Sequence, residues 1–167
     1  EEGNYDIAGL NYPIFFMRDG MRFPDMGRAL KPNPLSGVVE WWRRWDFHVN
    51  YPESTQMFTW LLDDIGVPTN WRTMDGWGMH TYKWVNAAGK ETWVRYTWDS
   101  HQCDKPLGQG CGFEDDDEAE RNLFSYRTLD LYDAINAGET IGWTLFVQLL
   151  DPDDWRLMRS LPFDPLD

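Results

Sequence analysis

Two stretches of β-branched and aromatic residues, separated by a short turn, place the strongest constraint on how this chain can fold. Residues 81–85 and 92–98 carry the residue types that favour strands, and Asn86-Ala87-Ala88-Gly89 lies between them. Gly89 can adopt the positive φ that a hairpin loop requires. The pattern therefore predicts a β-hairpin. One face of its second arm is fully apolar, since three residues share it: Val94, Tyr96 and Trp98.

Two apolar runs of strand length lie elsewhere in the chain, at residues 12–17 and 143–150. Continuous apolar runs of this length, bounded by turn residues, are typical of strands that are buried on both faces. Both are predicted to be central strands of a sheet.

Two helices are also predicted. Residues 52–65 have Pro and Glu in the first turn, Gly66 and Pro68 as a stop, and one apolar stripe formed by Met57, Trp60 and Leu61. Residues 129–137 form the second, with Gly138 in the position of a left-handed cap. Its inward residues are predicted to be Leu131, Ala134 and Ile135. Together these elements indicate one mostly antiparallel α+β domain over residues 1–167, with a barrel as one arrangement of its sheet.

The charge excludes two classes of partner. The net charge is −13, from 28 acidic and 15 basic residues, which repels phosphate backbones and anionic lipid headgroups. The apolar runs are far shorter than the about 20 residues of a membrane span. The acidic run at residues 114–120 is interpreted as a solvated loop before a helix; a calcium loop is the alternative, although the alternating acidic pattern and central glycine are missing.

Cys103 and Cys111 are the only cysteines, and they flank the sequence DKPLGQG. This loop is flexible enough to close in an oxidising compartment, but two cysteines do not establish a disulfide framework. His101 adds a possible metal triplet without a fourth ligand at zinc-like spacing. The preferred interpretation is that both cysteines are free, and no metal site is predicted.

The N-terminal stretch supplies the most specific signal. Residues 3–26 read GNYDIAGLNYPIFFMRDGMRFPDM and resemble the haem-catalase run GNxDLVGNNxPxFFxRDxxxFPDx. Further segments are similar to successive catalase segments, in order: ALKPNP (29–34), WDF (45–47), YPES (51–54), FTWLLDDIGVP (58–68), MDGWGMHTYKWVNAAGK (74–90), LDLYDAINAG (129–138), WTLFVQLLDP (143–152) and FDPLD (163–167).

The resemblance is weakest over an acidic insert at about residues 99–127 and strongest to the small-subunit clade that includes plant catalases. It implies an antiparallel β-barrel of catalase type, with helical insertions, of which this chain corresponds to a middle portion. It also suggests, without any targeting signal in the chain, a peroxisomal location.

The resemblance places Leu10 where the family keeps a catalytic asparagine. A leucine side chain cannot donate a hydrogen bond to a bound peroxide. Asn11 matches the next family asparagine, and the spacing from Gly9 to Pro13 leaves no room for a gap. The family's distal histidine and proximal tyrosine fall outside the matched segments, so no catalytic residue is assigned to this chain.

Cofactor positions are partly retained. By the resemblance, Phe15 and Phe23 wall the distal side of a haem and His80 lies near its proximal side, so haem is possible; core packing is the alternative for all three. Some catalases hold NADPH through a His, an Arg and a Lys. The matching residues here are Gln56, Ile65 and Asp99, which lack the cations of a phosphate clamp, so NADPH is not expected.

The chain has eleven tryptophans. One cluster combines Trp with Arg, the residue types enriched at binding hot spots: Trp41, Trp42, Arg43, Arg44 and Trp45. It predicts contact with a protein partner or with another copy in a homo-oligomer. A loop that covers the sheet and an aromatic platform for sugars are the alternatives.

The preferred interpretation of function is a non-catalytic structural or interaction subunit derived from a haem catalase. The residues that specify the fold are kept, whereas the catalytic asparagine is replaced by Leu10 and the cations of the phosphate clamp are missing. The alternative is part of a haem catalase that dismutates hydrogen peroxide to water and oxygen, with the distal His and proximal Tyr outside this chain. A third possibility is a small barrel that binds an apolar ligand in the emptied pocket.

Overall fold

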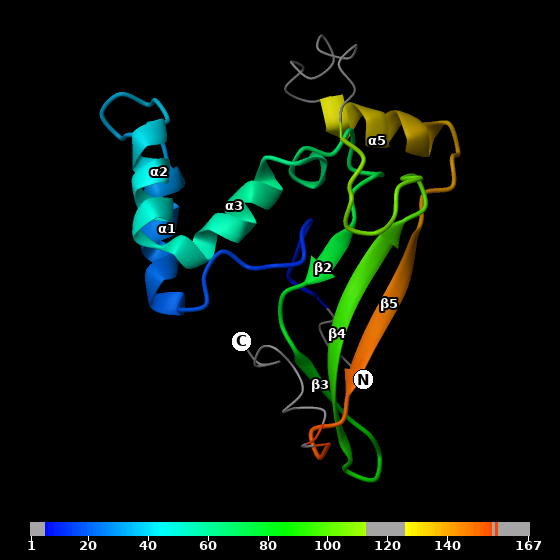
Figure 1. The fold of residues 1–167 in the computed structure, drawn as a ribbon. Coiled ribbons are helices and arrows are strands. Elements are labelled where there is room, and N and C mark those ends of the chain that lie inside the picture. Colours follow the sequence, from blue (N-terminus) through cyan, green and yellow to red (C-terminus); the bar gives the residue numbers. More distant parts are fainter. Residues whose placement is uncertain (1–5, 113–125, 155, 157–167) are drawn as a thin grey trace.

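The computed structural model describes residues 6–112, 126–154 and 156. Its helices are η1 (Gly20–Arg22), α1 (Phe23–Leu30), α2 (Trp41–Asn50), η2 (Pro52–Ser54), α3 (Thr55–Leu61), η3 (Asp64–Gly66) and α5 (Tyr126–Asn136), and its strands are β1 (Gly9–Leu10), β2 (Gly76–Gly78), β3 (Tyr82–Val85), β4 (Glu91–Ser100) and β5 (Trp143–Leu150). The sheet stands on one side of the molecule with α5 across one end, and α3 runs from the sheet to the α1–α2 pair (Figure 1). The acidic run predicted as a loop lies outside the described residues.

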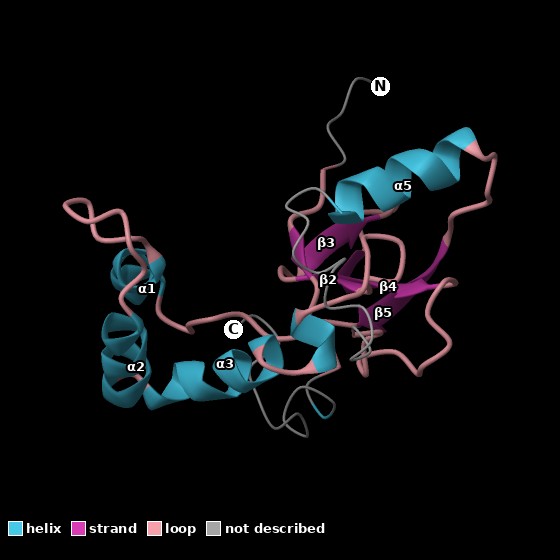
Figure 2. Ribbon diagram, turned by 90° about the horizontal axis from the view of Figure 1, so that it is seen from above, coloured by secondary structure: helices cyan, strands magenta, loops and turns pink. Residues whose placement is uncertain are grey.

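The ten-residue strand β4 organises the sheet. On one side it pairs antiparallel with all of β5, from Trp93 opposite Leu150 to Ser100 opposite Trp143. On the other side β3 pairs with its first half and β2 with its last residues, and β1 extends the sheet beyond β2. Figure 2 shows this sheet from above, with α3 and the α1–α2 pair extending away from it.

The predicted hairpin is confirmed as β3 and β4. The backbone N–H of Asn86 donates to the carbonyl of Lys90 across the turn, at 3.0 Å. The Asn86 side-chain oxygen accepts hydrogen bonds from the N–H groups of Ala88 and Lys90, both at 2.9 Å. Gly89 has φ +80°, the left-handed conformation expected of it.

The α+β class with an antiparallel sheet is confirmed, whereas closure into a barrel is not. The five described strands form an open sheet. β1 and β2 are two and three residues long, and they leave too few ladder partners to bring the two edges of the sheet together.

Two buried central strands were predicted. The prediction for residues 12–17 is wrong, and the prediction for residues 143–150 is confirmed as a strand but not as a central one. Residues 12–17 form bends rather than a strand. Pro13 cannot donate to a ladder, and Tyr12 and Met17 enter two different hydrophobic clusters. Residues 143–150 form β5 as predicted, but β5 lies at the edge of the described sheet and seven of its eight residues are exposed.

The helix predicted over residues 52–65 is present in three pieces, η2, α3 and η3. It breaks at Asp63, whose backbone is extended and whose carboxylate accepts the N–H of Asp64, starting η3. Met57 is fully buried as expected. The second helix, α5, also forms, and Gly138 has the predicted positive φ, +74°. Ile135 was predicted to face inward, but it is 61% exposed.

The described core consists of two clusters. Met17, Met26, Ala29 and Phe47 join α1 to α2. The second cluster joins the N-terminal segment, α3 and η3; its buried members are Tyr12, Met57 and Ile65. Among the described helices, none has the length and apolar character needed to cross a membrane.

The interpretation of Cys103 and Cys111 as free cysteines is wrong. They form a disulfide with a Cα–Cα distance of 5.8 Å. The polar turns and glycines of the loop between them allow its two ends to meet. His101 takes no part in a metal triplet, since its Nε2 lies 2.8 Å from Thr144 Oγ1, and the described residues contain no cluster of three metal-ligating side chains.

Candidate functional site

Leu10 lies on β1, opposite Trp77 of β2. Its half-buried side chain packs against the cluster of Tyr12, Met57 and Ile65. An apolar side chain suits this position, because a polar group here would need a hydrogen-bond partner. Leu10 therefore serves local packing and offers no hydrogen-bond donor to a ligand.

The neighbouring Asn11 has a structural role instead. Its side-chain Nδ2 donates to the backbone carbonyl of Ile65 at 2.7 Å, which ties the N-terminal segment to η3. This bond gives the Asn11 amide a role within the fold.

Phe15 and Phe23 lie face to face. Their ring centroids are 5.5 Å apart and the ring planes differ by 13°, while Phe16 contacts both rings edge-on. The turn at η1 brings these residues together. The two stacked rings are 46% and 42% exposed, respectively, so they present an apolar surface that the described residues do not cover.

His80 lies in an exposed bend between β2 and β3. Within the described residues its ring contacts Tyr82, edge to face at 6.1 Å, rather than either phenylalanine. The structure thus brings together two of the three predicted haem-pocket residues, and the haem contact of all three stays a prediction.

The positions matched to an NADPH site offer no cationic clamp. Gln56 is exposed on α3, and Asp99 is half-buried on β4. Ile65 is only 3% exposed and belongs to the core. Their geometry supplies no phosphate-binding group, but the absence of NADPH stays a prediction.

The tryptophan–arginine cluster forms the first half of α2. Trp41, Trp42 and Trp45 are each more than half exposed. The arginines turn toward α1: Arg43 donates to the carbonyl of Arg28 at 2.9 Å and Arg44 to that of Leu30 at 3.3 Å. The arginines thus fasten α2 to α1, a role that the sequence pattern does not reveal.

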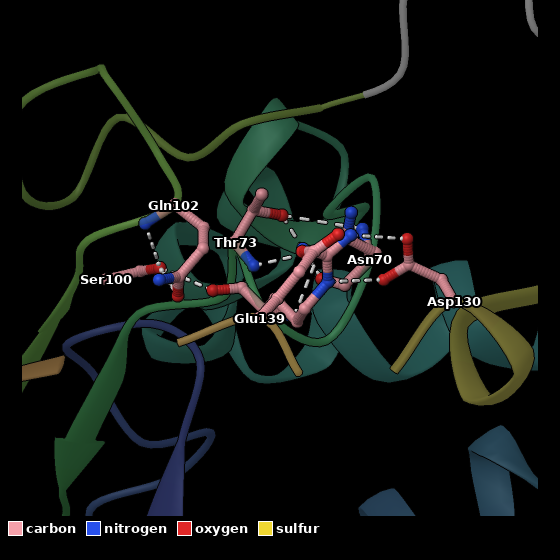
Figure 3. A network of polar contacts seen from close by, with 7 residues as sticks. Asn70, Thr73, Ser100, Gln102, Asp130 and Glu139 are labelled. Atoms are coloured by element: carbon pink, nitrogen blue, oxygen red, sulfur yellow. Dashed lines mark hydrogen bonds and ion pairs between the residues drawn. The ribbon is translucent and has the colours of Figure 1, made fainter. Parts of the chain in front are cut away.

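A polar network at the end of the sheet was not predicted (Figure 3). Arg72 donates to both carboxylate oxygens of Asp130, at 2.8 and 2.7 Å, and to Glu139 at 2.9 Å. The hydrogen bond to Asp130 is the main cause that raises the pKa of Arg72 above its usual value. Ser100 donates to the Arg72 carbonyl. The network joins α5 to β4 and acts as structural support.

Comparison with known proteins identifies the family. The family model described as catalase matches residues 1–167. The chain belongs to the catalase family. Catalase isozyme 1 of Nicotiana plumbaginifolia is 49% identical over 171 residues, covering 99% of this chain and 33% of the relative. Catalase-1/2 of Glycine max is 47% identical, covering 99% and 32%. The predicted resemblance is thereby confirmed.

Solved catalase structures agree. A bacterial catalase aligns with a TM-score of 0.85 and 38% identity, covering 100% of this chain and 31% of that chain. Catalase A from Saccharomyces cerevisiae aligns with a TM-score of 0.77 and 31% identity, covering 94% and 31%. The chain therefore spans about one third of the length of the catalases that it matches.

Catalase relatives imply a haem cofactor, and the described residues meet one of its requirements. The exposed, stacked rings of Phe15 and Phe23 suit the apolar face of a porphyrin. An anionic tyrosine ligand is a separate requirement. Burial raises the pKa of Tyr12, in the same region, to about 12, so its phenol is protonated at neutral pH.

Proposed function

We propose that this chain is a segment of a haem catalase that acts on hydrogen peroxide, and that it provides part of the distal wall of the haem pocket. The observation that carries the proposal is the stacked, exposed pair of Phe15 and Phe23 in a chain that matches catalases over 99% of its length. The distal histidine and the proximal tyrosine come from other parts of the protein.

In this role the two phenylalanine rings orient the cofactor and exclude water from its distal face. Haem, when bound, supplies the redox chemistry of peroxide dismutation. Leu10 extends the apolar wall but leaves the peroxide without one hydrogen-bond donor. We therefore expect slower catalysis than in a catalase that has asparagine at this position. In the whole protein the open sheet forms part of a β-barrel.

A second candidate function is a non-catalytic structural subunit, and Leu10 is the observation that favours it. A half-buried apolar side chain in place of the family's asparagine removes a group that touches the substrate, while it fits its neighbours well. In this role the exposed tryptophans Trp41, Trp42 and Trp45 contact a protein partner or a second copy of the chain. The net charge of −13 argues against a nucleic acid as that partner.

The two functions are separated by the whole protein's absorption spectrum, its rate of oxygen release from hydrogen peroxide, and the variant Leu10→Asn. For a haem catalase we expect a Soret band with stoichiometric haem. We expect Leu10→Asn to raise kcat/KM by about tenfold to a hundredfold, since one placed donor is restored at the reacting oxygen.

Leu10→Val is the matched control, because it changes the side chain without adding a donor; its kcat/KM should stay near that of the unchanged protein. Unfolding curves of all three proteins separate an effect on the site from an effect on packing. The catalytic role is rejected, and the structural subunit favoured, if the protein contains no haem. The same holds if it contains haem but neither the unchanged protein nor Leu10→Asn releases oxygen.

A further inference from the structure

The disulfide closes a loop directly after β4. Cys103 and Cys111 are eight positions apart, both are half-buried, and residues 104–107 between them are exposed. A cross-link over such a short loop stabilises a fold less than one over a long loop, and the exposed residues beside this half-buried disulfide leave it accessible to small reagents. The position therefore suits a bond that small oxidants and reductants can reach.

This loop braces η3. Lys105 Nζ forms a salt bridge to Asp64 Oδ2 at 2.9 Å. Gly110 has φ +68° and packs so tightly that a Cβ there would lie 2.5 Å from the backbone of Ile65. The carbonyl of Cys111 accepts the N–H of Thr69 at 2.7 Å. Contacts from both ends of the disulfide loop thus hold residues 64–69 in place.

η3 in turn holds the segment that carries Leu10. The Ile65 carbonyl accepts the side-chain N–H of Asn11 at 2.7 Å, and the Ile65 side chain lies in the cluster against which Leu10 packs. A continuous series of contacts therefore runs from Cys111 through Gly110 and Ile65 to Asn11 and Leu10.

One anchor of the loop does not depend on the disulfide. The buried carboxylate of Asp75 accepts the N–H of Ser100 at 3.0 Å and that of Gly108 at 3.1 Å. These two bonds hold Gly108 beside the end of β4, so two reduced thiols would stay near one another and could pair again.

We propose that Cys103 and Cys111 form a reversible redox clasp, which a dithiol reductant opens and hydrogen peroxide closes, and which in its closed form fixes η3 and the Leu10–Asn11 segment. The choice of hydrogen peroxide as the oxidant rests on the proposed function. The opening of the clasp and its effect on η3 rest on the loop contacts alone.

The chemistry balances in both directions. In opening, a dithiol is oxidised to its disulfide while the Cys103–Cys111 bond is reduced to two thiols. In closing, one thiolate attacks hydrogen peroxide, the O–O bond breaks, and a sulfenic acid and hydroxide form. The second thiol then attacks the sulfenic acid, the sulfur–sulfur bond forms, and water leaves.

The test uses the whole protein under native conditions. Dithiothreitol is applied and removed, any haem is blocked with azide so that the oxidant is not dismutated, hydrogen peroxide is added in equimolar amount, and remaining thiols are alkylated and located by mass spectrometry. Amide hydrogen exchange is followed in parallel for residues 64–69, with the β3–β4 hairpin as an internal control. The double variant Cys103→Ser with Cys111→Ser is the matched control.

We expect dithiothreitol to expose both thiols, hydrogen peroxide to remove them, and exchange at residues 64–69 to become about three- to tenfold faster in the open form, with the hairpin unchanged. In the double variant, amide hydrogen exchange at residues 64–69 should match that of the open form and should not change when the oxidant is added. A disulfide that opens only in denaturant overturns the proposal, as does unchanged exchange at residues 64–69.

Closure by glutathione disulfide but not by hydrogen peroxide overturns the assignment of the oxidant. Failure of the proposed function is recognised separately, by the haem absorption and the oxygen release, because thiol counting and hydrogen exchange are carried out with any haem blocked.

Discussion

Leu10 and Asn11 show how adjacent residues divide two roles. Leu10 fills an apolar cluster, whereas Asn11 ties the same segment to the Ile65 carbonyl through its amide. Exchanging the two residues would remove both interactions. The apolar cluster would receive an amide, and the Ile65 carbonyl would lose its hydrogen-bond donor. The side-chain chemistry of the pair is thus fixed by the fold around it.

Gly110 is a position at which the fold leaves no room for a side chain. Its φ is +68° and a Cβ would meet the Ile65 backbone at 2.5 Å. Gly110→Ala should lower the free energy of unfolding by about 1–3 kcal/mol through overpacking and backbone strain. Urea unfolding measures the loss. Gly37→Ala is the control, since Gly37 has φ +69° with open space around it; an equal loss in both variants would contradict the overpacking.

His48 gives the protein an acid-sensitive position. It is buried, its Nδ1 lies 2.7 Å from Ser54 Oγ, and its ring stacks on Phe58. Ser54 donates its own proton to the Tyr51 carbonyl, so the Nδ1–H of His48 donates to Ser54. Within the described residues, the buried Nε2 has no hydrogen-bond partner. A proton added there would be poorly solvated.

Burial lowers the pKa of His48 below its usual 6.5. The unfolded chain therefore binds a proton before the folded protein does, and stability that is complete above pH 6.5 is lost as the pH falls through the folded pKa. Urea midpoints measured between pH 8 and pH 5 should decrease. His48→Phe keeps a ring on Phe58 and should lose less stability over this range; an identical slope would contradict the assignment.

Residue-scale prediction from the sequence succeeded where the local pattern decides and failed where distant partners do. Gly89 and Gly138 have the positive φ expected from their turns. The burial of His48 depends on Ser54 and Phe58 in the next helical segments. The disulfide depends on how the loop after β4 folds back on Thr69. Neither was visible as a local pattern.

At the scale of elements, an ion-pair network is one of the contacts that hold α5 in place. Both carboxylate oxygens of Asp130 accept from Arg72, and both side chains are largely buried, at 19% and 14% exposure for Arg72 and Asp130. Buried pairs of this kind are costly to break because the remaining charge stays without its partner. Asp130 is therefore a main point of attachment of α5, beside the contacts of Arg127 with Pro68 and of Thr128 with Trp71.

Asp130→Asn should loosen α5 by about 1–3 kcal/mol, because a charge-assisted, bidentate contact becomes a neutral one. Amide hydrogen exchange along α5 measures this, with β4 as reference. Asp133→Asn, on the exposed face of the same helix, is the matched control and should leave exchange unchanged. If both variants exchange alike, Arg72 does not hold the helix.

The sequence predicted helices at residues 52–65 and 129–137 but missed α1 and α2, and it placed one strand wrongly. Residues 52–65 were recognised as helical, but the break at Asp63 follows from its capping of Asp64, which an amphipathic pattern does not show. The apolar run at residues 12–17 looks like a strand by composition. It bends because its large residues enter two separate clusters, a requirement set by α1, α2 and α3.

At the scale of the whole molecule, the family and the antiparallel α+β class follow from the sequence, while the shape of the sheet does not. Strand pairing needs partners, and β1 and β2 supply only short ladders. The pattern of strands was therefore compatible with a barrel, but the described strands remain an open sheet. The resemblance predicts that Phe15 and Phe23 belong to a haem pocket, but their face-to-face stacking depends on the turn at η1 and was not predicted.

The exposed strand β5 has a practical consequence for work with the isolated chain. Its outer edge has no strand partner within the described residues, and its apolar side chains are exposed, among them Leu145, Phe146 and Leu149. An open apolar edge is a template for adding strands from other molecules. The 167-residue chain, expressed by itself, is expected to aggregate through β5, and a lysine at Val147 would be the first change to make in keeping it dispersed.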